Sequence, residues 1–167
     1  MERHIIKNLI STVFFFALCL NISGCTDTSR TYSDITEQDI REIMDNVEEA
    51  LLNKDIDGVI KYMSPSVEIN ISRDTPVGPR TERWTRDKYK AETETALSMV
   101  SNYEYRRENQ VVKISDDMQS AVVETDVIEV MELFGNRMKT STHETVVMEI
   151  IDGDLLVTKM DAKVKGT

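Results

Sequence analysis

The sequence predicts one α+β domain in which three N-terminal helices pack on one face of a curved antiparallel sheet. Three stretches between residues 34 and 100 have apolar residues at helical spacing. From Tyr103 to the end, apolar residues alternate with polar ones. Turn signals at Asp116-Asp117, Gly135-Asn136 and Asp152-Gly153 divide that last part into about four long strands.

The first helix has the clearest signals. Asp34 or Thr36 can cap its start, and Glu37 or Asp39 three residues later can complete a capping box. The apolar side chains that follow recur at helical spacing: Ile40, Ile43, Met44, Val47 and Leu51.

A shorter second helix is predicted after Asp55, and Ser64-Pro65 should end it because the residue before a proline disfavours helical backbone. Its apolar residues are Ile56, Val59, Ile60 and Met63. A strand follows, because Val67, Ile69 and Ile71 alternate with polar residues.

The stretch 73–83 is predicted to be a loop, because prolines and a glycine lie there among several charges. Thr85 can then cap a third helix. One face of that helix holds Tyr89, Thr93, Ala96, Leu97 and Val100.

The turn at Gly135-Asn136 sets the predicted register of the strands around it. With these two residues in the turn, Phe134 pairs with Arg137, and Glu132 lies opposite Lys139 as an ion pair. One face of the sheet then holds Ala121, Val123, Thr125, Val127, Glu129, Glu144, Val146, Met148 and Ile150. The other face holds Glu124, Asp126, Ile128, His143, Thr145 and Glu149.

Size and charge limit the classes of function. The chain has 167 residues, of which 40% are hydrophobic, and this fits one domain with a real core. Its 30 acidic and 20 basic residues give a formal net charge of −10. Because such a body repels nucleic acid and no basic stripe offsets the charge, we expect no nucleic-acid binding.

The N-terminal segment has the layout of a secretory signal. Arg3, His4 and Lys7 precede an apolar run from Leu9 to Leu20. A transmembrane helix needs roughly 20 apolar residues, so this run is too short to span a bilayer comfortably. We therefore expect residues 1–24 to be a signal peptide.

The end of this segment, Ile22-Ser23-Gly24-Cys25, resembles the lipobox of bacterial lipoproteins. The resemblance implies cleavage between Gly24 and Cys25, lipid on the sulfur of Cys25, and a polar tether over residues 25–34. The alternative is an ordinary secreted protein in which Cys25 keeps a free thiol. Because Thr26 follows the cysteine, the resemblance favours the periplasmic face of the outer membrane if the cell is Gram-negative.

Three later segments carry a second resemblance: the helical pair ending in Asp55-Ile56-Asp57-Gly58-Val59, the strand after Ser64-Pro65-Ser66, and the closing Ile151-Asp152-Gly153-Asp154-Leu155. In this order they resemble the NTF2-like superfamily, with its SnoaL-like and ketosteroid-isomerase-like members. The resemblance implies a cone-shaped domain over residues 35–167.

Glu129 and Glu144 are the candidate site residues with the most specific chemistry. We expect them as diagonal neighbours on the mostly apolar face, where two carboxylates can be driven to different pKa values for acid–base work. The alternative is a pair of solvated glutamates at one end of the sheet. Tyr62, Trp84 and Tyr89 either line the mouth of the same pocket or pack in the core.

His143 and Asp126 are a second candidate catalytic pair, on the more polar face, where a carboxylate could orient an imidazole that shuttles protons. The alternative is a surface ion pair, worth about 0–1 kcal/mol. No metal site and no cofactor are predicted, because the chain has 2 histidines, one of them in the signal, and no glycine-rich phosphate loop.

These observations lead to three hypotheses. The leading one is a membrane-anchored envelope lipoprotein that binds a small apolar ligand or a protein partner without catalysis. The alternative is a small-molecule isomerase, dehydratase or cyclase that uses Glu129 or Glu144, with His143 as a second candidate. The third is an interaction module that forms a homodimer through the exposed face of the sheet.

Overall fold

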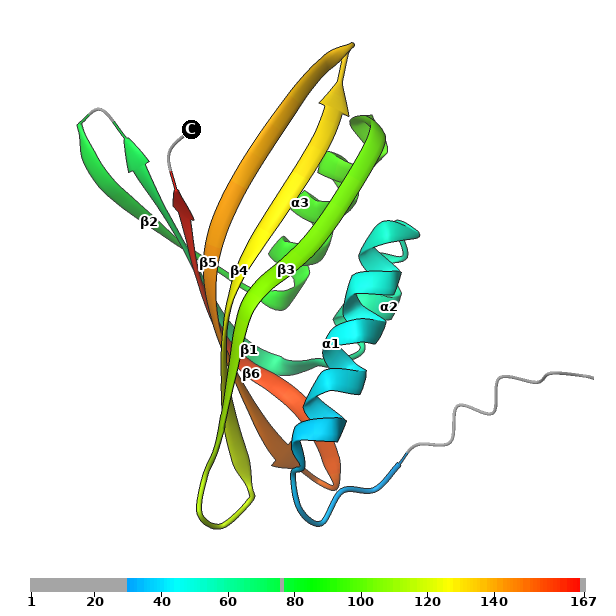
Figure 1. Cartoon of the computed structure of the whole chain (residues 1–167), viewed down its shortest axis with the longest axis vertical. Coiled ribbons are helices and arrows are strands. Elements are labelled where there is room, and N and C mark those ends of the chain that lie inside the picture. The colour runs from blue at the N-terminus through cyan, green and yellow to red at the C-terminus, as the bar shows by residue number, and fades with distance from the viewer. Residues whose placement is uncertain (1–29, 76, 166–167) are drawn as a thin grey trace, which may run out of the picture.

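The computed structural model describes residues 30–75 and 77–165 (Figure 1). Its helices are α1 (Glu37–Leu52), α2 (Ile56–Ile60) and α3 (Arg86–Met99). Its strands are β1 (Met63–Thr75), β2 (Gly78–Trp84), β3 (Val100–Ile114), β4 (Ser120–Leu133), β5 (Asn136–Ile151) and β6 (Asp154–Lys165). The predicted signal peptide, Gly24 and Cys25 lie outside the described residues.

The six strands form one curved sheet in the order β2-β1-β6-β5-β4-β3. Neighbouring strands are antiparallel except β1 and β6, which run parallel with Ile69 opposite Met160. The predicted α+β class with three helices is therefore confirmed, but the sheet is mixed rather than antiparallel. The parallel pair arises because the chain leaves β1 through β2 and α3, builds β3 to β5, and returns beside β1.

The three helices cover one side of this sheet, its concave side in Figure 1. The inner face of the sheet supplies fully buried residues, and α1 adds others to the same core. Examples are Ile40, Ile69, Val123, Val127 and Met148, each no more than 1% exposed. Among the described residues, no helix is long and apolar enough to cross a membrane.

The stretch 73–83 is a β-hairpin, so the prediction of a loop there was wrong. Thr75 pairs with Gly78, and Asp74 pairs with Pro79. Gly78 has a positive φ of 115°, which suits the tight reversal of the chain. Pro79 is tolerated because β2 is an edge strand, where a missing N–H need not break a ladder.

The β4–β5 turn lies one residue earlier than predicted. Phe134 and Gly135 occupy it with φ values of 51° and 79°, and Leu133 pairs with Asn136. Glu132 therefore lies opposite Arg137, and the predicted pairing of Glu132 with Lys139 was wrong. The partner changes by two residues, an even shift, so every side chain keeps its predicted face of the sheet. Glu129 now lies opposite Thr140 and Glu144 opposite Thr125, so the two glutamates share a face but the prediction that they are diagonal neighbours was wrong.

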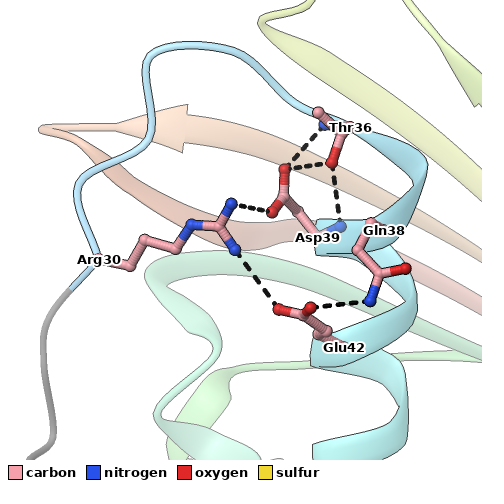
Figure 2. A network of polar contacts seen from close by, with 5 residues as sticks. All are labelled: Arg30, Thr36, Gln38, Asp39 and Glu42. Carbon is pink, nitrogen blue, oxygen red and sulfur yellow. Dashed lines mark hydrogen bonds and ion pairs between the residues drawn. The ribbon is translucent and has the colours of Figure 1, made fainter.

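A capping box begins α1, as predicted for Thr36 and Asp39 (Figure 2). The Thr36 hydroxyl accepts a hydrogen bond from the Asp39 backbone at 3.2 Å, and the Asp39 carboxylate accepts one from the Thr36 backbone at 3.0 Å. The Arg30 guanidinium lies 2.7 Å from the other oxygen of Asp39, an ionic contact without hydrogen-bond alignment. Asp39 is 1% exposed, so this pair fastens the start of the described chain to α1.

Candidate functional site

A cavity of about 390 Å³ lies between the concave face of the sheet and the three helices. All six strands and all three helices contribute lining residues, most of them apolar. Cavities of roughly 300–1,000 Å³ with mostly apolar walls and a few polar groups are typical of small-molecule sites. The core of this domain is therefore hollow on the side that α3 covers.

The structure brings all five predicted pocket residues to this cavity. Tyr62 follows α2, Trp84 ends β2, Tyr89 lies on α3, Glu129 on β4 and Glu144 on β5. They come from five different segments, and only the closed fold places them together. Binding of a ligand by these residues stays a prediction.

Glu144 is the carboxylate with the more perturbed environment. Burial, and then the negative charge of Glu129, raise its pKa from 4.5 to about 7, while the charge of Arg107 acts in the opposite direction. None of the described residues contributes a hydrogen bond to this shift. The side chain keeps a partly exposed surface, and that surface borders the cavity.

Glu129 has hydrogen-bond donors, in contrast to Glu144. The hydroxyl of Tyr103 donates to it at 2.6 Å, and the hydroxyl of Thr140 donates at 3.4 Å from the opposite position on β5. Burial, and then the charge of Glu129, raise the pKa of Tyr103 far above its ordinary value. Tyr103 therefore stays protonated as a donor throughout the neutral range.

Two more tyrosines lie close to both carboxylates. Burial raises the pKa of Tyr89 and of Tyr105, and the charge of Glu144 is the second cause in each case. The charge of Glu129 contributes to both shifts as well. The cavity thus has aromatic rings and neutral hydroxyls around two acidic groups.

The prediction from sequence missed Tyr103 and Tyr105. Both line the cavity from β3, where they alternate with Asn102, Glu104 and Arg106 on the outer side. This alternation was the signal that could have found them, because every second residue of a strand faces the same side.

Arg107 is a positive charge close to Glu144 that is already paired. Its side chain is 11% exposed, and it donates to Glu48 at 2.8 Å and to Asp45 at 2.6 Å on α1. A third donor of the guanidinium reaches Gln110 at 3.0 Å. Arg107 therefore joins β3 to α1, and each nitrogen of its guanidinium has an acceptor outside the cavity lining.

His143 and Asp126 lie on the outer face of the sheet, apart from the two glutamates. They are directly opposite each other on β4 and β5, rather than diagonal, with 3.1 Å between the imidazole Nδ1 and the carboxylate. Asn109 and Lys165 also donate to Asp126, and these hydrogen bonds lower its pKa. Neither residue of the pair borders the cavity.

Within residues 30–75 and 77–165, no group of three or more His, Cys, Asp or Glu side chains is arranged to hold a metal ion. The polar groups that line the cavity are carboxylates, phenols and threonine hydroxyls, with Arg73 at its exposed edge. This set of groups can bind polar atoms and transfer protons.

Comparison with known proteins found similarity in structure only: the sequence matches no family model and no curated protein. An NTF2-like protein from Cytophaga hutchinsonii has a TM-score of 0.61 at 14% identity, covering 78% of this chain and 100% of its own. A putative scytalone dehydratase from Novosphingobium aromaticivorans has a TM-score of 0.60 at 14% identity, covering 77% and 83%.

The structure of LinA is similar to the same extent, with a TM-score of 0.61 at 13% identity over 76% of this chain and 84% of LinA. At such identities the similarity defines the fold and not the activity. The described chain has the NTF2-like fold, as its sequence resemblance predicted.

Proposed function

We propose that this domain binds a small, mostly apolar molecule in the cavity beneath α3. The observation that carries the proposal is the cavity itself, because a domain of this size normally fills its interior with side chains. Apolar walls favour an apolar ligand body, and the few carboxylates and hydroxyls can orient one polar group.

Trp84 offers a direct way to measure binding, because it is the one tryptophan of the chain and it lines the cavity. We expect its fluorescence to change saturably when tert-butylbenzene, a compact apolar probe, is titrated into the full-length protein. Ala162→Phe fills the cavity opposite Glu144 and should abolish the change. Lys163→Phe places the same ring on the exposed outer side of β6 and serves as the matched control.

Ala96→Phe is a second cavity variant, placed on α3, for the case that the buried Ala162 site does not accept the ring. Loss of binding in either folded variant, with Lys163→Phe unchanged, supports the proposal. Equal binding by the wild type and by every folded cavity variant contradicts it, because the probe would then bind elsewhere.

A second candidate function is acid–base catalysis on a molecule in the same cavity. The specific observation is the pKa of about 7 at Glu144, since a general acid or base works best when its pKa is near the operating pH. The similar structure of a putative scytalone dehydratase also fits this chemistry. Glu144 would hold or release the proton, and the Tyr103–Glu129 pair would provide a hydrogen-bonded neighbour.

Deuterium exchange into an enolisable ketone tests this second function without knowledge of the substrate. If Glu144 removes a proton from carbon, the protein should accelerate exchange at the α-carbon of cyclohexanone in heavy water. Glu144→Gln should abolish the acceleration, and Glu149→Gln, on the outer face of the same strand, should preserve it. An acceleration that survives Glu144→Gln would contradict this role.

We further propose that lipid on Cys25 holds the domain at a membrane of the cell envelope. The support is the lipobox-like sequence ending at Cys25, and Arg30, five residues later, pairs with Asp39 of the domain. Mass spectrometry of the protein from its own membranes should show an acylated N-terminal Cys25. A mature chain with a free Cys25 thiol would contradict the anchor but not the cavity.

A further inference from the structure

Resting on the proposed function, we infer that the ligand carries a cationic nitrogen on its apolar body, held between the two cavity carboxylates and the neighbouring tyrosine rings. The class of ligand is thus an amine or alkylated ammonium compound small enough for about 390 Å³. The inference depends on which charges face the cavity and on which of them already have partners.

The charges inside the cavity are negative. Among the described lining residues, the charged ones are Arg73, Glu92, Glu129 and Glu144. Arg73 and Glu92 are exposed and carry opposite charges, so together they add no net charge to the lining. The two partly buried charges are the glutamates, and an anionic ligand would be repelled by both.

Glu144 has no hydrogen-bond donor among the described residues, and its side chain borders the cavity. Glu129 accepts hydrogen bonds from Tyr103 and Thr140, but no described residue donates to Glu144. The nearby Arg107 makes no hydrogen bond to Glu144, and its three guanidinium nitrogens donate to Asp45, Glu48 and Gln110 instead. The carboxylate of Glu144 is partly buried and open to a mostly apolar cavity, where a cationic group of a ligand can pair with it.

Aromatic rings around the carboxylates favour a cation over a neutral donor. Tyr89 and Tyr105 are close enough to Glu144 for its charge to act on both, and Tyr103 lies against Glu129. The faces of aromatic rings attract ammonium groups, and the attraction strengthens when water is excluded. Carboxylate and ring together match an alkylated nitrogen, which sheds its water more readily than a metal ion.

Binding of such a cation must be coupled to the ionisation of Glu144. The free protein protonates this group below pH 7, and only the ionised form attracts a cation. Affinity should therefore rise with pH up to about 7 and then level off. The other titratable and charged groups that line the cavity are Tyr62, Arg73, Tyr89, Glu92, Tyr103, Tyr105 and Glu129, and the charge of Arg107 also acts on Glu144.

Two probes of equal shape test the inference. Phenyltrimethylammonium is a permanent cation, so any pH dependence belongs to the protein, and tert-butylbenzene is its neutral counterpart. Titrated into the full-length protein and followed by Trp84 fluorescence, the cation should bind at least tenfold tighter at pH 8.5 than at pH 5.5. The neutral probe should show no such increase.

Variants assign the effect to one side chain. Glu144→Gln should remove the pH dependence and lower the affinity for the cation at pH 8.5 at least tenfold, while leaving tert-butylbenzene bound. Glu149→Gln, on the outer face of β5, should behave as the wild type. Rescue of the wild-type profile by Glu144→Asp would add further support.

Equal, pH-independent affinity for both probes would overturn the inference and leave the cavity as a site for neutral ligands. If tert-butylbenzene binds more tightly than phenyltrimethylammonium at pH 8.5, the inference is overturned in the same way. If neither probe binds the folded protein, the inference and the proposed function both fall. Binding of tert-butylbenzene therefore distinguishes failure of the cation inference alone from failure of the proposed function.

Discussion

Glu129 and Glu144 face the same cavity from neighbouring strands, but only Glu129 has hydrogen-bond donors among the described residues. Burial, and then the negative charge of Glu129, raise the pKa of Glu144 to about 7. Glu144 can therefore change charge near neutral pH, and the Tyr103 hydroxyl donates to its neighbour Glu129 instead. The proposed ligand chemistry depends on this asymmetry.

The raised pKa of Glu144 predicts how stability depends on pH. Because its pKa is 4.5 in ordinary surroundings and about 7 in the fold, the folded state holds the proton more tightly, and stability falls as pH rises from 4.5 through 7. Glu144→Gln should remove this fall, which amounts to about 3 kcal/mol at most. Urea unfolding of both proteins between pH 4.5 and 8.5 measures the difference.

Glu149→Gln is the matched control for that experiment, because this glutamate is exposed on the same strand. Its unfolding free energy should follow the wild type at every pH. Parallel curves for the wild type and Glu144→Gln would show that Glu144 ionises with an ordinary pKa.

Arg107 should influence both the stability and the ionisation of Glu144. Its ion pairs with Asp45 and Glu48 join β3 to α1, so Arg107→Gln should cost about 2 kcal/mol of unfolding free energy. The arginine charge also lowers the pKa of Glu144, so its removal should raise that pKa further. Arg106→Gln, at the exposed next position, should change neither quantity.

Tyr103→Phe should destabilise the domain by about 1 kcal/mol, because Glu129 loses its shortest hydrogen bond. The matched comparison is Tyr105→Phe, two residues along the same face of β3. Among the described residues, none forms a hydrogen bond that shifts the pKa of Tyr105. Chemical denaturation measures both variants. An equal loss in the two would mean that the Tyr103–Glu129 contact does not contribute specifically.

Thr36→Ala removes the side chain that caps α1 and should cost about 1 kcal/mol. The exposed Ser33→Ala, three residues earlier, should cost less than half of this. Thermal unfolding checks the pair, and equal melting temperatures for Thr36→Ala and the wild type would contradict the capping box.

The local features of the fold could be predicted from the sequence. Thr36 and Thr85 cap their helices as expected, α2 begins after Asp55 as expected, and the Asp152-Gly153 turn forms with positive φ at both residues. The faces of β4 and β5 were also predicted, because side-chain alternation survives a register shift of two residues. These features depend on neighbours within a few residues.

The features that were not predicted from the sequence depend on distant or weak signals. The parallel pairing of β1 with β6 joins segments separated by most of the domain, and no local pattern reports it. The hairpin at 73–83 was hidden by its charges and prolines, which an edge strand tolerates. At the site, the two glutamates came from alternation, and the same alternation could have found Tyr103. Its contact with Glu129 and the pairing of Arg107 with α1 join distant segments, which no local pattern reports.

The titration of the Glu144 carboxyl carbon by NMR, assigned by comparison with Glu144→Gln, is the most direct test of the proposed site. We predict a midpoint near pH 7 in the free protein, and a lower midpoint when phenyltrimethylammonium is bound. A midpoint near the ordinary 4.5 that neither phenyltrimethylammonium nor tert-butylbenzene changes would contradict the ligand site built around this carboxylate.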